Sequence, residues 1–145
     1  MKSKKGITLM ILVVAIAIML VLISSASVIG YNSINTAKYD DYMSQLSRIS
    51  DNVNQYFLQQ GELPITQEQI DSASFSDKLN NAIAKNNDQV NRLYVIDMSK
   101  IPDSSVTIGK GDLSNKDICI VADNSLNVYY LNGFKYKNNL YFTKQ

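Results

Sequence analysis

Apolar residues fill almost every position from Ile7 to Ile23, and Thr8 is the one exception in this run. No charged side chain occurs between Lys5 and Lys38. A helix needs about 20 predominantly apolar residues to cross the roughly 30 Å of hydrocarbon in a bilayer. The pattern therefore predicts a membrane-spanning helix near the start of the chain.

An apolar stripe of helical period follows this run, with steps of four, three, four and three residues: Tyr42, Leu46, Ile49, Val53 and Tyr56. No breaker stronger than Gly30 separates the two patterns, whereas Gly61 and Pro64 can cap and stop a helix. We predict one continuous helix from about Ile7 to Gln59, which would be about 80 Å long at 1.5 Å per residue.

The remaining sequence predicts a small domain with a short helix and several strands. Leu79 and Ile83 are four residues apart behind a possible N-cap at Ser74 or Ser76, which predicts a helix over about Phe75–Lys85. Period-two patterns rich in β-branched and aromatic residues predict four or five strands: RLYVIDM, SVTIG, DICIVA, LNVYYLNG and NLYFT. The turn residues in DNS and KYKNN indicate that the last three strands form an antiparallel meander.

Packing the apolar stripe of the long helix onto this sheet would give an α+β domain. We expect Tyr42, Leu46, Ile49 and Val53 to lie against one face of the sheet. The residues expected on that face are Val95, Ile118, Ile120, Val128 and Tyr130.

Charge and composition exclude several classes of function. Fourteen basic residues oppose thirteen acidic ones, and three of the basic residues, Lys2, Lys4 and Lys5, precede Gly6. Loss of that leader would leave eleven against thirteen, without the basic block that nucleic-acid binding favours. The chain has no histidine and one cysteine, Cys119, so we expect no intrachain disulfide, no Cys/His metal site and no cofactor. We interpret Cys119 as a buried strand residue.

Two topologies are compatible with the apolar run. The lysines before it would hold the N-terminus in the cytoplasm by the positive-inside rule and leave the domain outside. A conventional secretory signal is the alternative, with Ser24 and Ala26 as the small residues before a cleavage site. The length of the run and the helical stripe that continues beyond it favour a retained helix.

The sequence KKG followed by ITLMILVVAIAIML resembles the leader and N-terminal helix of type IV pilins and type II secretion pseudopilins. The resemblance implies cleavage between Gly6 and Ile7 by a prepilin peptidase, methylation of the new Ile7 amine, and assembly of the helices into a filament. It divides the chain into a leader (1–6), a transmembrane and filament-core segment (7–30) and an extracellular pilin-like domain (31–145). Other pilin subunits, a platform membrane protein and an assembly ATPase are the implied partners.

The sequence departs from the family at Ile11, where pilins normally carry a glutamate five residues into the mature chain. It also lacks the C-terminal cysteine pair of many pilins from diderm bacteria. The segment NSLNVYYLNGFKYKNNLYF is similar to the C-terminal hairpin of small pilin-like proteins from Gram-positive bacteria. The resemblance and its departures imply a minor, priming or tip-proximal subunit, and a Gram-positive source.

An enzyme and a binding module are the other two classes of function for such a chain. An enzyme would need a catalytic constellation, and the serines and aspartates of DYMSQLSRISD are the polar face of an amphipathic helix. A membrane-anchored or secreted binding module is the alternative, because exposed members of a tyrosine set could contact a surface, DNA or a secreted substrate: Tyr129, Tyr130, Tyr136 and Tyr141. We expect alternate tyrosines of that set to lie in the core.

Overall fold

The computed structural model describes the backbone of residues 2–68 and 70–145, and the side chains of residues 5–23, 30–68 and 70–145. The chain forms two compact units, Met1–Lys38 and Tyr39–Gln145, and we call the second unit the head. Helix α1 (Lys2–Gln60) contributes to both units. The predicted helix is therefore confirmed, but it begins five residues earlier than expected. Lysine is a good helix former, and Gly6 alone does not stop the helix.

Helix α1 ends as its sequence predicts. Gly61 has a φ of 72°, and its amide donates a hydrogen bond of 2.9 Å to the carbonyl oxygen of Phe57. Glycine adopts this left-handed conformation without the steric cost that a Cβ adds. Pro64 follows, and its carbonyl oxygen accepts a hydrogen bond of 2.8 Å from the amide of Asp97.

The head contains a three-stranded antiparallel sheet in the order β1 (Leu93–Val95), β2 (Cys119–Ala122), β3 (Val128–Tyr130). Helix α2 (Asp77–Lys85) precedes it, and the Ser76 hydroxyl caps α2 by accepting a 3.2 Å hydrogen bond from the amide of Leu79. Two short 3₁₀ turns, η1 (Ser72–Ser74) and η2 (Val90–Arg92), flank α2. The predicted helix, its cap and these three strands are confirmed, although each strand is shorter than its apolar pattern.

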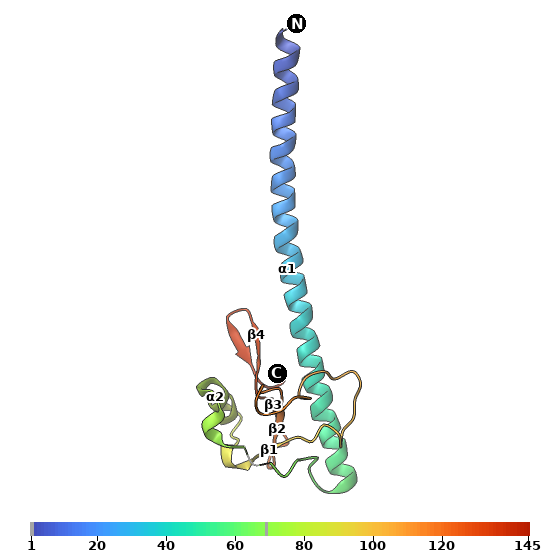
Figure 1. Ribbon diagram of the computed structural model, residues 1–145, viewed down its shortest axis with the longest axis vertical. Coiled ribbons are helices and arrows are strands. Elements are labelled where there is room, and N and C mark those ends of the chain that lie inside the picture. Colours follow the sequence, from blue (N-terminus) through green and yellow to red (C-terminus); the bar gives the residue numbers. More distant parts are fainter. Residues whose placement is uncertain (1, 69) are drawn as a thin grey trace. The chain divides into compact units, whose positions relative to one another are not determined.

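Both faces of this sheet are buried, and Figure 1 shows α1 and α2 on opposite sides of the strands. The face toward α1 forms one apolar cluster with the stripe of the long helix: Tyr42, Leu46, Ile49, Val53, Cys119, Val121, Val128 and Tyr130. The face toward α2 forms a second cluster, which includes Leu79, Ile83, Val95, Ile118, Ile120 and Tyr129. The sheet is thus the middle layer of the head.

The expected partners of the helical stripe are therefore only partly correct. Val128 and Tyr130 lie in its cluster as predicted, whereas Val95, Ile118 and Ile120 lie in the cluster of α2. All four residues of β2 are buried, so its sequence carries no polar alternation that distinguishes the two faces. A one-residue error in register moves every side chain to the other face.

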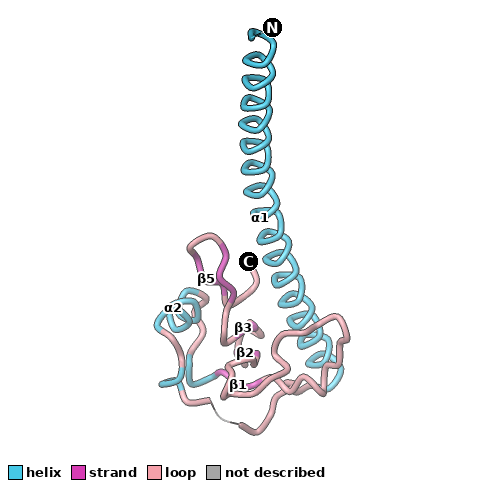
Figure 2. Tube along the Cα trace, turned by 45° about the horizontal axis from the view of Figure 1, so that its top comes forward, coloured by secondary structure: helices cyan, strands magenta, loops and turns pink. Residues whose placement is uncertain are grey.

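The predicted meander of the last three strands is wrong in its final pairing. β5 (Asn139–Tyr141) pairs with β4 (Phe134–Tyr136), a strand that was not predicted, and these two form a separate sheet. Lys137 and Asn138 make the turn with positive φ values of 48° and 25°, which suits a two-residue hairpin. The hairpin is shown beside the label β5 in Figure 2.

The hairpin packs its aromatic side chains on α1. The rings of Tyr39 and Tyr136 stack with centroids 4.3 Å apart, and the Tyr42 hydroxyl donates a 2.8 Å hydrogen bond to the carbonyl oxygen of Tyr141. The segment after β5 also contacts the three-stranded sheet, because the amide of Tyr130 in β3 donates a 2.7 Å hydrogen bond to the carbonyl oxygen of Phe142. These contacts attach the end of the chain to both α1 and β3.

No strand forms over SVTIG, which is a further correction. Gln45 of α1 replaces a neighbouring strand there, because its Oε1 accepts hydrogen bonds from the amides of Thr107 (2.8 Å) and Ile108 (3.2 Å). Gly109 follows with a φ of 76°, and a Cβ built there would lie 2.7 Å from Sγ of Cys119. Val106 is nevertheless fully buried. The apolar pattern thus belongs to a loop with one buried apolar side chain, and a side chain of the helix holds this loop.

Candidate membrane-spanning and processing segment

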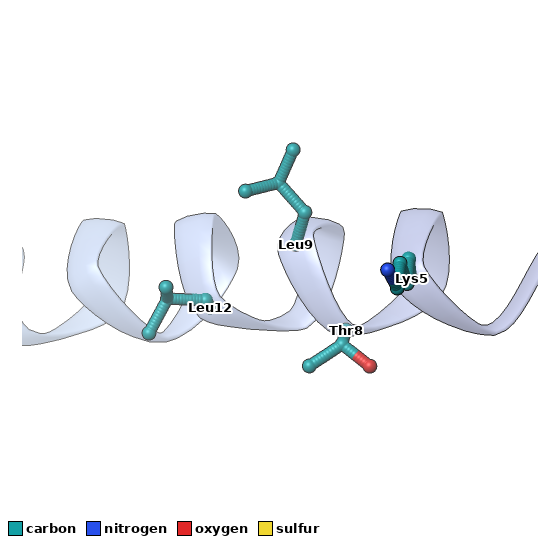
Figure 3. Close-up of a pocket in the computed structure, with 4 residues that line it drawn as sticks. All are labelled: Lys5, Thr8, Leu9 and Leu12. Carbon is teal, nitrogen blue, oxygen red and sulfur yellow. The ribbon is translucent and has the colours of Figure 1, made fainter.

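The segment Lys5–Ile23 is the part of α1 that is long and apolar enough to cross a membrane, and we call it the span. All of its side chains are exposed in the isolated chain. Four of them, Lys5, Thr8, Leu9 and Leu12, line a shallow hollow on the helix surface. In the view of Figure 3, Leu9 points up and Thr8 points down from the helix. An apolar surface on every side of a helix requires an apolar environment on every side.

The Gly6–Ile7 bond lies inside α1, one turn from its N-terminus. A Cβ built on Gly6 would have no atom within 4 Å, so glycine is not required there by packing. Glycine instead lowers helix stability by about 1 kcal/mol relative to alanine. The helix turn around the Gly6–Ile7 bond is therefore easier to unwind than an alanine-containing turn would be.

Ile11 lies four residues, or about 6 Å along the axis, after Ile7. Its side chain is apolar and exposed. Lys5 precedes the Gly6–Ile7 bond, and its side chain is exposed. The side chains of Lys2 and Lys4, and those of Ser24 and Ala26 in the alternative signal site, lie outside the described residues.

The candidate groups for other chemistry are distributed over the head without forming a site. Cys119 is fully buried in β2, as predicted, and burial raises the pKa of its thiol well above the ordinary value. Such a thiol is not a ready nucleophile. Among the described residues, no group of three or more Asp, Glu, His or Cys side chains could hold a metal ion.

The four tyrosines considered for binding divide between the core and the surface of the head. Tyr129 and Tyr130 are buried, and burial is the main cause that raises the pKa of Tyr130 to about 12. Tyr136 and Tyr141 are half-buried, and both contact the ring of Tyr39. Their rings thus pack mainly against the head itself.

Asp88 is a buried carboxylate that was not predicted from the sequence. It accepts hydrogen bonds from the hydroxyl of Tyr129 (2.6 Å), the hydroxyl of Ser125 (2.7 Å) and Nδ2 of Asn127 (2.9 Å). Three donors compensate the burial of the charge, so the cluster joins the loop after α2 to the β2–β3 turn. The NND sequence indicated only a preference for a turn. The role of Asp88 is structural, because all three of these donors belong to the head.

Comparison with known proteins gives no relative from which a function could be transferred: no family model, curated protein or solved structure matches the chain.

Proposed function

We propose that the chain is a structural subunit of a type IV pilus-like or type II secretion-like filament, held in the membrane before assembly. The observation that supports this most is the continuity of α1, which runs from the leader through the span into the core of the head. An ordinary signal peptide would be removed before folding, and its helix need not continue into the domain.

The apolar environment that the span requires can come from lipid or from identical helices. Exchange between the two changes the hydrophobic free energy little, because the tails of lipids are as apolar as leucine. Assembly would therefore depend on contacts that are specific to the filament and on separate machinery. That machinery consists of a prepilin peptidase, a platform membrane protein and an assembly ATPase, with the N-terminus starting in the cytoplasm and the head outside.

Ile11 favours a minor, priming or tip-proximal subunit over an abundant one. A carboxylate at the bilayer centre would cost about 2.5 to 3.5 kcal/mol and would require a partner. The cost is smaller at residue 11, which lies near the start of the span. Without this carboxylate, the chain cannot attract the amine of a subunit above, whereas its own Ile7 amine can still be paired from below. We expect the protein to be scarce in sheared filaments, and Ile11→Glu to improve assembly little. Filaments made mainly of this protein would make it a major subunit.

Intact mass measurement of the mature protein tests the processing step. The expected product has 139 residues, the full 145 less a leader of six, and begins with N-methylated Ile7. Gly6→Val should block cleavage because a β-branched side chain crowds the bond and stiffens the backbone. Gly30→Val in the same helix is the matched control, since a Cβ there also has no atom within 4 Å, and it should be processed normally.

Two other N-termini would indicate the competing functions. A mature N-terminus near Ser27 would show a secreted protein and refute the filament proposal. An intact Met1 in cells that contain the peptidase would show a simple anchor, which supports a membrane-bound binding module instead.

A further inference from the structure

The edge of the main sheet at β1 is only partly paired. β1 is an outer strand in the order β1-β2-β3, and it is the lowest of the three strands in Figure 1. A short segment begins a fourth strand beside it, because Ile65 pairs with Ile96 and the amide of Thr66 donates a 2.9 Å hydrogen bond to the carbonyl oxygen of Val95. Of the described residues from 67 to 72, none forms a backbone hydrogen bond with β1. The fourth strand therefore stops before it has covered the edge.

The carbonyl group of Leu93 lies on the uncovered part of this edge. On one side of Leu93, the amide of Asp123 donates a 3.2 Å hydrogen bond to the carbonyl oxygen of Arg92. On the other side, the amide of Ile96 donates a 2.9 Å hydrogen bond to the carbonyl oxygen of Cys119. Backbone groups alternate in direction along a strand, so the carbonyl group of Leu93 points away from β2.

This carbonyl group has no partner within the described part of the chain, although Leu93 as a residue is only 6% exposed. Buried backbone carbonyl groups are rarely left unpaired in folded proteins. An unpaired strand edge of this kind is a template for a further strand.

A groove with a volume of about 560 Å³ lies beside this edge, and we call it the β1 groove. The described residues that line it come from three segments: Ile70, Asp71, Ser72, Val90, Asn91, Leu93 and Tyr94. Ile70 and Val90 are half-buried and pack against the cluster on the α2 side of the sheet, whereas Asp71 is exposed. Ligand sites in proteins typically have volumes of 300 to 1,000 Å³. The β1 groove is therefore large enough to hold a ligand.

The wall of the β1 groove is acidic. Asp71 is the one charged side chain among the described residues that line it. The segment 61–77, which contains this wall, has four acidic residues and no lysine or arginine: Glu62, Glu68, Asp71 and Asp77. A cationic ligand side chain would find a carboxylate here.

The basic side chains close to β1 have partners within the head. Nε of Arg92 lies 2.8 Å from Oδ1 of Asp123. Nζ of Lys100 donates a 3.2 Å hydrogen bond to the carbonyl oxygen of Ile65, at the end of the edge that is already paired. The two lysines of α2 are exposed and do not line the groove: Lys78 and Lys85. None of these lysines or arginines neutralises Asp71 by an ion pair in the described structure.

We infer that the β1 groove binds an extended basic peptide segment of another protein, which continues the fourth strand that Ile65 and Thr66 begin. A backbone amide of the peptide donates to the carbonyl oxygen of Leu93. Successive side chains of a strand point to opposite faces, so apolar side chains can contact Ile70 and Val90 while a lysine or arginine lies beside Asp71. Addition of a strand to an exposed sheet edge is a common mode of peptide recognition.

This inference goes beyond the proposed filament and does not depend on it. Every residue of the β1 groove belongs to the head, so an anchored chain that never assembles has the same groove. Failure of peptide binding would leave the cleavage between Gly6 and Ile7 unaffected. Failure of that cleavage would likewise leave peptide binding unaffected.

Binding of a synthetic peptide to the full-length chain in neutral detergent micelles tests the inference. The probe is a fluorescently labelled peptide of alternating lysine and valine with both ends blocked, and the anisotropy of the label measures its binding. We expect saturable binding, and weaker binding of a glutamate–valine peptide of the same length. A signal no larger than that of micelles without protein would overturn the inference, and so would equal binding of the two peptides.

N-methylation of alternate peptide residues tests the pairing of the strands. Methyl groups on the residues whose amides face β1 should weaken binding about tenfold, the effect of leaving one buried carbonyl unpaired. Methyl groups on the other alternate residues face away from β1 and should change the binding little. Equal binding of the two methylated peptides would exclude strand addition.

Asp71→Asn tests the preference for basic peptides. Asparagine keeps a side-chain oxygen that can accept the 2.9 Å hydrogen bond from the amide of Ala73, so the η1 turn should be preserved. The affinity for the lysine–valine peptide should fall by up to about fivefold, the range of one exposed charge pair. Asp51→Asn, at an exposed position of α1 outside the groove, is the matched control and should bind like the unaltered chain. Equal affinities of the two variants would contradict a role of Asp71.

Sedimentation of the same samples identifies a different occupant. We expect the chain to have the same oligomeric state with and without the peptide. A dimer that the peptide separates into monomers would show that a second copy occupies the β1 groove, and would overturn the inference.

Discussion

Leu46 provides the strongest test of how α1 holds the head together. It is 1% exposed and lies in the cluster that joins the helix to the sheet. Leu46→Ala would remove most of a fully buried side chain and leave a cavity, which costs about 3 kcal/mol in comparable sites. Alanine is a good helix former, so the helix itself should not be weakened. The loss would be a large fraction of a typical stability of 5 to 15 kcal/mol.

Leu58→Ala is the matched control, because it makes the same change in the same helix at a side chain that is 82% exposed. It should change the stability by less than about 0.5 kcal/mol. Leu46→Asp should be more severe than Leu46→Ala and should unfold the head, since it buries an unpaired charge.

Thermal unfolding of the full chain in detergent micelles measures these effects. Near-ultraviolet circular dichroism is the suitable signal, because eight of the nine tyrosines lie in the head and only Tyr31 precedes it. Leu46→Ala should lower the unfolding midpoint by roughly 15 °C, given about 4 to 8 °C per kcal/mol for a domain of this size. Equal midpoints for Leu46→Ala and Leu58→Ala would refute the packing of the stripe on the sheet. The stripe would then face other molecules.

Three further predictions concern the head. Gln45→Leu should cost about 1 to 3 kcal/mol, because two loop amides lose their acceptor, whereas Gln55→Leu on the exposed side of α1 should be neutral in the same melting experiment. Gly109→Ala should destabilise more than Gly61→Ala, because both have positive φ but only Gly109 would bring a Cβ against Cys119; equal midpoints would contradict this steric account. Burial raises the pKa of four groups in the folded head: Tyr42, Cys119, Tyr129 and Tyr130. The same groups lose their protons near pH 8.5 to 10 in the unfolded chain. Stability should therefore be retained below that range and fall as the pH rises through it. A midpoint that stays constant from pH 8 to 11 would contradict that linkage.

The elements that the sequence predicted correctly are those whose signal is local. The stripe from Tyr42 to Val53 repeats at helical period over several turns, and Gly61 and Ser76 are typical cap residues in typical positions. Each of these signals depends on neighbours within one or two turns. Their agreement with the structure shows that local preference and tertiary packing favour the same conformation in these segments.

The errors occur where contacts distant in sequence decide the outcome. Gln45 binds the loop near Thr107, 62 residues away, and this contact makes a strand there unnecessary. The assignment of Ile120 to the wrong face arose because β2 is buried on both sides, and Ile118, just before β2, was misplaced with it. The pairing of β5 with β4 depends on the turn at Lys137, whose positive φ is not evident from a lysine. For the span, the sequence predicted an apolar helix, and the structure contains it. The cleavage site stays a prediction, because recognition by a peptidase does not depend on contacts within the chain.

The two parts of α1 have different requirements for their surroundings, and this difference makes the proposed assembly physically reasonable. In the head, one stripe of the helix is apolar, and the sheet of the same chain covers it. In the span, every described side chain is exposed, so the apolar surface must be covered by something outside the chain. A transfer of the span from lipid to neighbouring helices would leave the core of the head unchanged, because its apolar cluster is complete within residues 39–145. Folding of the head and assembly of the span can therefore occur as separate steps.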